Sequence, residues 1–258
     1  MSEFQVEALR AVGFLGALAV AVPLERLSPH AHLRGDRSVN VSLWLINAVI
    51  VGAMCGGCAF TAARWAAGEG IGLLRFVGAE AWIAVPAAVV VLDLVSYAWH
   101  RANHRVPLLW RFHQVHHSDV TFTVSTGTRF HPGEVLLSLP VRLAAVVLLG
   151  APVAGVLAFE VAFTSANLVE HGDIGWSRRV ESFLGVFLVT PATHRSHHTK
   201  VGSARDHNFG TIFPWWDKLF GTYNASDSME RIETGLPGLD RGGVRDALWL
   251  PLRRGGLG

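Results

Sequence analysis

Charged residues are scarce in this chain, and lysine is nearly absent. Only 16% of the 258 residues are Asp, Glu, Lys or Arg, whereas a soluble domain carries about 25%. Half of the residues are hydrophobic, and the mean hydropathy is +0.34. This composition excludes a disordered chain and a long coiled coil. The formal net charge of +2 is too small for a nucleic-acid-binding face. The composition instead predicts a polytopic membrane protein.

Cysteine is also scarce. The only two, Cys55 and Cys58, form the sequence CGGC inside an apolar run. One close pair cannot build a disulfide framework, and a thioredoxin-like motif would need a βαβ setting that the sequence does not predict. Gly52 and Gly56 make a G-x-x-x-G on the same stretch, which favours close helix approach. We therefore expect these small residues to pack between helices.

Long apolar runs predict the membrane spans. Residues 8–25, 41–63 and 81–100 each approach or exceed the ~20 residues that a spanning helix needs. The run 135–170 has Gly150, Pro152 and Gly155 near its middle, which predicts a helical hairpin. The expected fold class is all-α: a polytopic membrane bundle of about four transmembrane helices, with the hairpin adding a fifth. A histidine-rich helical domain is expected outside the membrane.

Basic residues predict the orientation of this bundle. On the predicted topology, 18 of the 22 Lys and Arg lie on one side. The positive-inside rule places that side in the cytoplasm. Because the basic residues are almost all arginine, the composition suggests a GC-rich bacterial genome. We therefore expect a bacterial inner membrane with the histidine-rich domain at its cytosolic face.

Histidine is the abundant ligand-type residue, with 13 in the chain. His30 and His32 lie in an arginine-containing loop, where we expect them to be solvated. Most of the others form three clusters with spacings of i, i+3 and i+4, so that each cluster occupies one face of a helical turn. Such spacing lets several imidazoles reach one metal ion. The clusters are His100 and His104; His113, His116 and His117; and His194, His197 and His198.

A stripe of polar residues runs down the third span toward the first cluster. Asp93 and Tyr97 precede His100 by seven and three residues on the same helix face. A carboxylate inside an apolar run is costly without a partner, so we expect Asp93 to accept the free N–H of a metal-bound histidine. In the later span, Asn167 and His171 are one helical turn apart. His171 is therefore a ninth predicted ligand, with Asn167 behind it or in a coordination position.

Two long segments resemble the fatty acid hydroxylase/sterol desaturase superfamily. The first runs from DLVSYAWHRANHR to RFHP, and the second comprises EHGDIGW and the stretch from VTPATHRSHH to KLFGTY. The resemblance covers about residues 81–223. It implies an integral membrane, non-haem di-iron oxygenase in which histidines on cytosolic helix extensions enclose two iron ions. The implied ligands are His100, His104, His113, His116, His117, His171, His194, His197 and His198.

The chain departs from the family pattern near His171. Family members often carry H-x-N where this chain has His171-Gly-Asp173, and some have a histidine where Asn167 stands. The resemblance therefore implies nine histidine ligands rather than ten. His131 in Arg-Phe-His-Pro and His207 in Asp-His-Asn-Phe-Gly stand in family-like motifs without paired ligand spacing. We expect these two, like Asp173, to support or line the site, and direct binding to the metal is the alternative for each of them.

The expected chemistry requires a redox metal and an external electron source. Imidazole ligands suit iron, zinc and copper, but oxidation of an unactivated C–H bond excludes zinc. The sequence carries no flavin, nicotinamide or haem-binding motif, so a separate protein of cytochrome b5 or ferredoxin type must supply electrons for O₂. The expected reaction is hydroxylation or desaturation of a lipid, sterol or similar apolar substrate.

The residues leave two other functions open. A membrane zinc hydrolase would also use histidines, but H-E-x-x-H is absent and the histidines exceed a three-ligand site. A haem electron carrier would hold paired histidines within its spans, whereas these clusters lie at membrane ends. We expect three regions: transmembrane helices in 1–80, the catalytic domain in 81–223 and a tail in 224–258.

Overall fold

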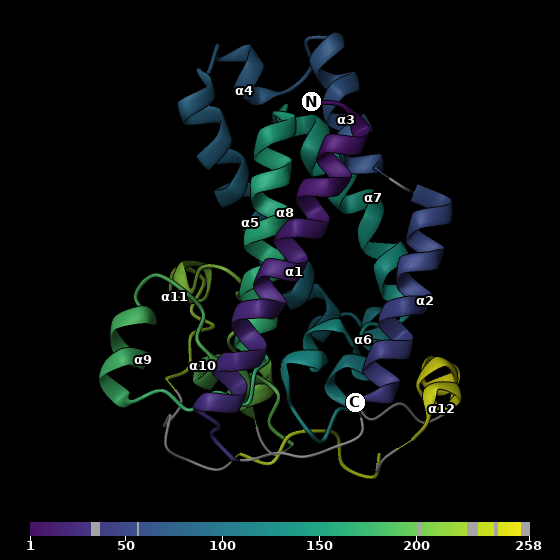
Figure 1. The fold of residues 1–258 in the computed structure, drawn as a ribbon, viewed down its shortest axis with the longest axis vertical. Coiled ribbons are helices and arrows are strands. Elements are labelled where there is room, and N and C mark those ends of the chain that lie inside the picture. Colours follow the sequence, from purple (N-terminus) through teal and green to yellow (C-terminus); the bar gives the residue numbers. More distant parts are fainter. Residues whose placement is uncertain (32–36, 56, 201–202, 226–231, 240–241, 254–258) are drawn as a thin grey trace.

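The structure is a computed structural model that describes residues 1–258 except 32–36, 56, 201–202, 226–231, 240–241 and 254–258. Its described part is helical throughout, with two isolated β-bridges and no longer strand (Figure 1). The α-helices are α1 (Glu3–Leu27), α2 (Ser38–Cys55), α3 (Cys58–Gly68), α4 (Leu73–Phe76), α5 (Ala81–Arg105), α6 (Pro107–His117), α7 (Pro132–Leu149), α8 (Val153–Glu170), α9 (Arg178–Leu184), α10 (Pro191–His197), α11 (Trp215–Leu219) and α12 (Val244–Trp249). Three 3₁₀ turns complete them: η1 (Val124–Thr128), η2 (Ser203–Asp206) and η3 (Leu250–Leu252).

Five segments are long and apolar enough to cross a membrane. They are α1, the stretch Ser38–Phe76, α5, α7 and α8. Their outward faces carry many large apolar side chains, among them Val12, Leu15, Val49 and Leu148, each more than half exposed. A soluble protein would bury such side chains, whereas a bilayer solvates them. The prediction of an integral membrane helical bundle is confirmed.

The predicted span 41–63 is not one continuous helix. Helix α2 ends at Cys55 and α3 begins at Cys58, and Gly57 between them has a φ of 72°. Because this left-handed conformation suits glycine, the CGGC sequence breaks the helix instead of only packing it against neighbours. Gly56, part of the predicted packing motif, lies outside the described residues.

The predicted hairpin is present. Helix α7 ends at Leu149 with Gly150 in the left-handed conformation, and Pro152 precedes the first residue of α8. A Cβ at Gly150 would lie 3.0 Å from the Cα of Gly72, so glycine also permits the close approach of the loop before α4. The hairpin therefore brings both ends of the 135–170 stretch to the same end of the bundle.

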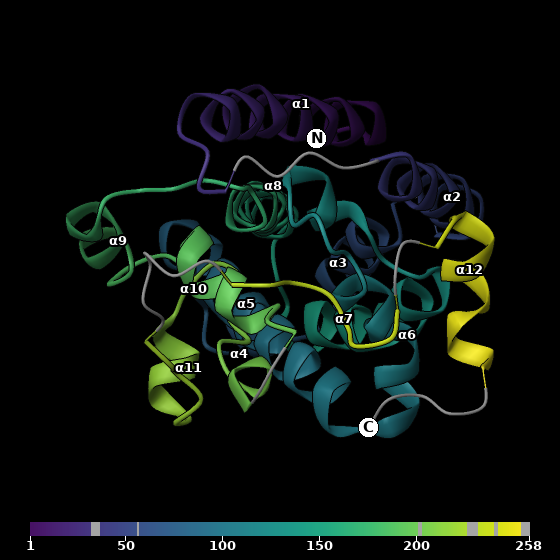
Figure 2. The same cartoon turned by 90° about the horizontal axis from the view of Figure 1, so that it is seen from below.

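Helix α8 lies between α1 and α5, as Figure 2 shows from below. A Cβ at Gly13 of α1 would lie 2.8 Å from Val161 of α8, and one at Gly155 of α8 would lie 2.7 Å from Ala88 of α5. Helices in lipid associate mainly through such close packing of small residues, because burying apolar area gains little there. The packing fixes α5 and α8 against each other, and both helices end at the histidine-rich region.

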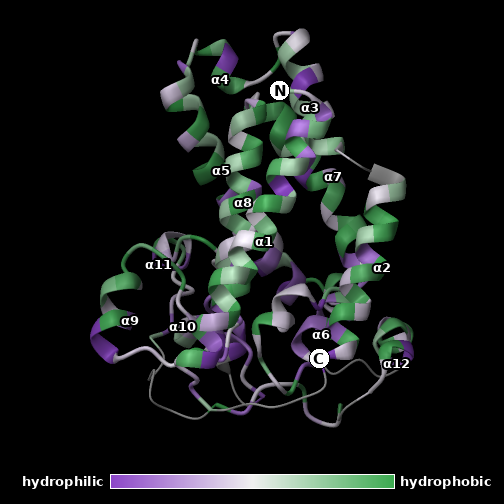
Figure 3. Cartoon of the chain, viewed as in Figure 1, coloured by the Kyte–Doolittle hydropathy of each residue, from purple (hydrophilic) through white to green (hydrophobic). Residues whose placement is uncertain are grey.

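Polar residues gather at the lower end of the bundle in Figure 3, around α6 and α10. The loop between α6 and α7 is held there by a buried network in which Asn40 and Thr126 donate hydrogen bonds to Asp119 at 2.8 and 2.7 Å. Burial alone would raise the pKa of the Asp119 carboxyl, but the Arg129 guanidinium and the donated hydrogen bonds hold it below its ordinary value. This network therefore fixes the loop between α6 and α7 at the histidine-rich end of the bundle.

Candidate metal centre

Four segments carry the nine predicted histidines. Helix α5 continues beyond its apolar part to present His100 and His104, and His171 caps the C-terminal end of α8. Helices α6 and α10 each begin with a proline, Pro107 and Pro191, which is favourable at the first helical position. The prolines set where these short helices start. They thereby set the direction of six histidines, of which five lie on α6 and α10 and the sixth, His198, directly follows α10.

The nine histidines form two groups, and within each group the candidate ligand nitrogens lie within 4.8 Å of one another. The clusters of the sequence do not correspond to these groups. Residues at i and i+4 share a group, and the residue at i+3 joins the other, so α6 and α10 each contribute to both. The first group is His100, His104, His113, His117 and His197, and the second is His116, His171, His194 and His198.

The two groups adjoin each other. The rings of His117 and His198, one from each group, stack with centroids 4.2 Å apart. Within the second group, the Nε2 atom of His171 lies 3.0 Å from Nε2 of His116 and 2.9 Å from Nε2 of His194. Two ring nitrogens this close can form a hydrogen bond only when one of them is protonated, whereas a metal cation could accept a lone pair from all three rings. The geometry suits metal ligation.

Buried ring nitrogens without a partner provide a separate test of fit to a metal. Buried polar atoms in proteins are nearly always hydrogen-bonded, so each exception needs a reason. Six of the nine histidines have at least one buried ring nitrogen with no hydrogen-bond partner among the described residues. Nitrogen lone pairs at this density are what two neighbouring metal ions require. The histidines are His104, His113, His116, His117, His194 and His198.

Burial keeps six imidazoles outside the spans in the neutral form. Burial lowers the pKa of His197 to about 3 and that of His171 to about 4. Burial, followed by the charge of neighbouring imidazoles, also lowers the pKa of the others well below the ordinary value. A metal binds the deprotonated ring, so the folded site keeps its ligands in the binding form at neutral pH. The others are His116, His117, His194 and His198.

Glu134 orients the first group, and sequence reasoning missed it. This buried carboxylate lies in the first turn of α7, where its Oε1 atom is 2.8 Å from Nδ1 of His113 and accepts a hydrogen bond from Asn103 at 3.0 Å. Such an acceptor fixes which ring nitrogen carries the proton and directs the other toward the metal. Its position three residues after His131, in the RFHPGE motif, is the signal that could have identified it.

Glu170 is a second buried carboxylate, close to two histidines of the second group but beyond hydrogen-bond distance of them. It is 1% exposed, and its carboxylate oxygens lie 3.8 Å from Nδ1 of His171 and 3.8 Å from Nδ1 of His194. Sequence reasoning missed this residue too, although it directly precedes His171. A glutamate completing an apolar helix next to a predicted ligand is the signal that was available.

Main-chain carbonyls orient three of the histidines. A carbonyl only accepts, so each contact assigns the ring proton to Nδ1 and leaves the lone pair on Nε2. Asn167 contacts His171 through its main-chain carbonyl, and its side-chain amide N–H donates to Gly127 O at 2.6 Å. The pairs are His100 with Phe209 O at 2.9 Å, His197 with His207 O at 2.7 Å and His171 with Asn167 O at 2.7 Å.

The structure corrects the role predicted for Asp93. Its carboxylate accepts hydrogen bonds from the N–H groups of Ile212 and Phe213 at 3.2 Å each and from the indole N–H of Trp216 at 2.9 Å. Asp93 precedes His100 by seven residues, which is about 10 Å along the helix. The segment around Trp216 folds back across α5 and brings donors that are closer than any histidine N–H.

Three other predicted supporting residues also have partners away from the two groups. The Tyr97 hydroxyl is hydrogen-bonded to Thr222 at 2.8 Å. The Asp173 carboxylate accepts from the N–H of Ala31 at 3.0 Å, which ties the loop after α1 to the end of α8. His131 caps α7 by accepting from the N–H of Gly133 at 2.9 Å. His32, expected to be solvated, lies outside the described residues.

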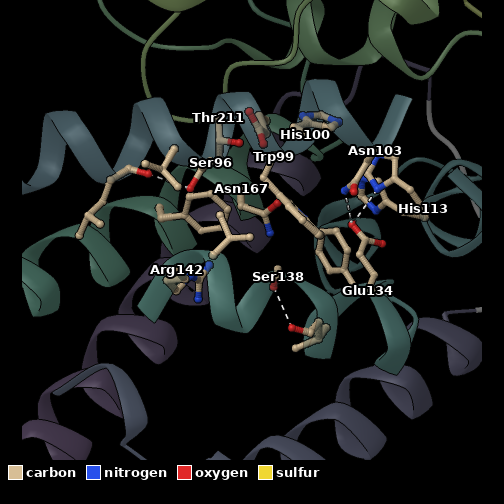
Figure 4. Close-up of a pocket in the computed structure, with 18 of the residues that line it drawn as sticks. Ser96, Trp99, His100, Asn103, His113, Glu134, Ser138, Arg142, Asn167 and Thr211 are labelled. Carbon is tan, nitrogen blue, oxygen red and sulfur yellow. Dashed lines mark hydrogen bonds and ion pairs between the residues drawn. The ribbon is translucent and has the colours of Figure 1, made fainter. Parts of the chain in front are cut away.

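A cavity of about 220 Å³ opens beside the histidines, between α5, α7 and α8. Apolar side chains such as Leu92, Trp99 and Phe163 make up much of its wall. Figure 4 shows His113, Asn103 and Glu134 together at one end of the lining. Members of both groups face this cavity, so an apolar molecule within it would meet histidines from each group. The lining histidines are His100, His113, His116, His171 and His194.

Comparison with known proteins agrees with this geometry. The model of the family described as fatty acid hydroxylase matches residues 85–222, more than half of the chain and all nine histidines. The chain belongs to the fatty acid hydroxylase family. The expected resemblance is thereby confirmed. No solved structure gave a significant match to this chain.

Curated relatives of this hydroxylase-family chain carry lipid-related names. The chain is 29% identical to the ornithine lipid hydroxylase OlsE of Rhizobium tropici over 67% of its own length and 51% of that protein. It is 31% identical to human (Homo sapiens) alkylglycerol monooxygenase over 58% of its length and 32% of the relative. A cholesterol 25-hydroxylase-like protein of Danio rerio is 33% identical, over 60% of this chain and 59% of that protein. The chain thus spans less than two thirds of each of these relatives.

Proposed function

We propose that this protein is a membrane-bound non-haem di-iron oxygenase that hydroxylates a lipid or similar apolar substrate with O₂. The observation that carries the proposal is the pair of adjoining buried histidine groups facing an apolar cavity. Nine ligands are proposed, five for one iron and four for the other, as the groups divide them. When bound, two ferrous ions would supply the redox chemistry that activates O₂ toward a C–H bond.

Hydroxylation is favoured over desaturation by the comparisons. The three relatives cited above are named as hydroxylases or a monooxygenase. The family match likewise weighs against a zinc hydrolase and a haem electron carrier. Histidine ligands by themselves do not select iron, so the choice of metal follows from the redox requirement of the proposed reaction.

The chain's own residues position the ligands and exclude water. Glu134 holds Asn103 and lies against His113, so the first group is oriented before a substrate enters. Apolar residues around the cavity, such as Leu92 and Phe159, would bind an alkyl chain next to the histidines and keep bulk water out. The five apolar segments would let such a substrate arrive sideways from the bilayer.

We also propose an electron donor and an orientation in the membrane. A separate cytochrome b5-type or ferredoxin-type protein would deliver electrons at the cytosolic face, because the topology predicted from the sequence assigns 18 of the 22 basic residues to the histidine side. The proposed location is a bacterial inner membrane. The proposed divisions are 1–80 for the first transmembrane helices, 81–223 for the catalytic domain and 224–258 for the tail.

Metal analysis combined with an optical spectrum tests this function. We expect purified protein to contain about two irons per chain without the Soret band of haem. Membranes that contain the protein should then form hydroxylated lipid in the presence of O₂ and a reducing system. Stoichiometric zinc with no iron-dependent product would contradict the proposal, as would a haem spectrum.

A further inference from the structure

Arg142 is a basic residue within the membrane-spanning helix α7. It lies ten residues after Pro132 and seven before Leu149, away from both helix ends. An arginine at this depth is costly in a bilayer, so it marks a functional site unless a structural partner explains it. Neither the histidine centre nor the predicted fold uses it.

Arg142 lines the same cavity as the histidines. Figure 4 shows it at the end of the lining away from His113 and Glu134. It follows Glu134 by eight residues on α7, which corresponds to about 12 Å along the helix axis. A molecule in the cavity would therefore meet the histidines at one end and a guanidinium at the other.

The guanidinium has five N–H donors, yet no described residue accepts a hydrogen bond from it or forms an ion pair with it. Its described contact is with the face of Phe163, 5.9 Å from the ring centroid. Glu160 lines an adjoining cavity together with Arg142, but its carboxylate is paired with Arg10 at 2.8 Å. Arg10 is also paired with Glu7 at 2.9 Å, and neither of these carboxylates forms an ion pair with Arg142.

We propose that Arg142 binds an oxyanion, a carboxylate or a phosphate, carried by the lipid that occupies this cavity. A guanidinium presents a planar pair of donors that matches such oxyanions bidentately, and the apolar surroundings strengthen the contact. The lipid chain then extends along α7 toward the histidines. This inference rests on the proposed function, because it makes Arg142 the residue that sets how far along the chain oxidation takes place.

Lipid binding to metal-free protein tests the inference without any turnover. The chelator-treated full chain in detergent is titrated with two pairs of ligands: oleate against oleyl alcohol, and dioleoyl phosphatidate against dioleoylglycerol. We expect the charged member of one pair to bind about 10–100-fold more tightly, as a charge-assisted hydrogen-bonded pair would give. Preference within the first pair identifies a free carboxylate, and preference within the second identifies a phosphate headgroup.

Variants connect that preference to the residue. Arg142→Gln should bind both members of the pair equally, and Arg142→Lys should retain part of the preference. Arg75→Gln is the matched control, because it removes an exposed arginine from α4 outside both cavities and should behave as the wild type. Iron content equal to that of the wild type shows that a variant keeps its fold.

The outcomes separate the two proposals. Undiminished preference in a folded Arg142→Gln protein would overturn the inference. If that variant does not fold, the wild type alone decides, since equal affinity within both ligand pairs would also overturn it. An intact preference in a protein that never oxidises lipid would contradict the proposed function and leave the role of Arg142 standing.

Discussion

At the scale of single residues, neighbouring histidines belong to different groups. His116 and His117 are adjacent on α6, yet the first lies with His171 and the second with His197. Successive residues on a helix differ in direction by about 100°, so one turn can serve two centres placed on either side of it. Under the proposed function each histidine therefore serves one metal, and single substitutions should show which one.

We predict unequal metal loss when one histidine is removed from each group. His116→Ala leaves three histidines in the second group and should lower the iron content to about one per chain, with no turnover. His197→Ala leaves four in the first group and should lose less metal. Elemental analysis of the purified variants measures this. His131→Asn is the control, because asparagine can still cap α7. Full iron and full turnover in His116→Ala would refute the ligand assignment.

A second residue-scale prediction concerns pH. The pKa of His171 is lowered to about 4 in the folded protein, while the unfolded ring titrates near its ordinary value of about 6.5. Between these values the unfolded chain binds more protons, so stability is complete above about pH 6.5 and falls as the pH drops toward 4. At pH 5.5 each such histidine lowers the free energy of unfolding by about 1.4 kcal/mol relative to neutral pH.

The measurement is the melting temperature of metal-free protein in detergent from pH 7.5 to 5. We expect the melting temperature of the metal-free protein to decrease as the pH drops through this range. With metal bound, the decrease should begin at a lower pH, because the metal competes with protons for the same nitrogens. A melting temperature that does not change with pH would show that these imidazoles are not buried in neutral form.

At the scale of elements, the segment from His207 to Asp217 holds the lower end of α5 in register with α10. Its carbonyls contact His100 and His197, and Asp93 and Asp217 bind its N–H groups. The stripe on α5 thus serves the metal centre indirectly. It fixes the segment that orients one histidine from each helix.

We therefore predict that Asp93→Asn acts through this segment. An amide accepts fewer of the three N–H groups than a carboxylate, so stability should fall by about 2 kcal/mol. Iron should be lost mainly from the first group. The Asp93→Asn and Trp216→Phe pair should show a coupling of about 0.5–3 kcal/mol in a double-mutant cycle followed by thermal unfolding. Strictly additive effects would show that the indole contact carries no stability.

At the scale of the whole molecule, α4 and α9 lie at opposite ends of the bundle in Figure 1. Each carries an exposed arginine, Arg75 and Arg179. The proposed orientation places α9 and the histidines in the cytosol. The depth at which a lipid is oxidised and the side from which electrons arrive both follow from it.

Cysteine labelling tests this orientation. In a background without Cys55 and Cys58, Arg75→Cys should react with a membrane-impermeant thiol reagent applied to intact cells. Arg179→Cys should react only after the cytosolic face is opened. Exposed arginines replaced by cysteine are expected to change stability by less than about 0.5 kcal/mol, so both variants should fold. The reverse labelling pattern would overturn the proposed route of electrons from the cytosol.

The sequence by itself determined what depends on local pattern. Hydropathy predicted the spans and the hairpin at Gly150, because a helix must match the thickness of the bilayer. Ligand spacing identified eight of the nine histidines, and the alignment of Asn167 with His171 in the later span added the ninth. Hydropathy alone predicted 41–63 as one continuous span, but the left-handed conformation of Gly57 interrupts it.

Only the tertiary structure decided which residues meet across helices. Asp93 was predicted to serve a histidine, but it binds Trp216, 123 residues away in sequence. Glu134 reaches His113 from another helix, and Arg142 shares a cavity with histidines from four segments. Such contacts depend on how far each helix extends and how it is rotated against its neighbours. Neither quantity is contained in the periodicity of one segment, so the sequence predicted the histidines that gather in the two groups but not the carboxylates and carbonyls that contact them.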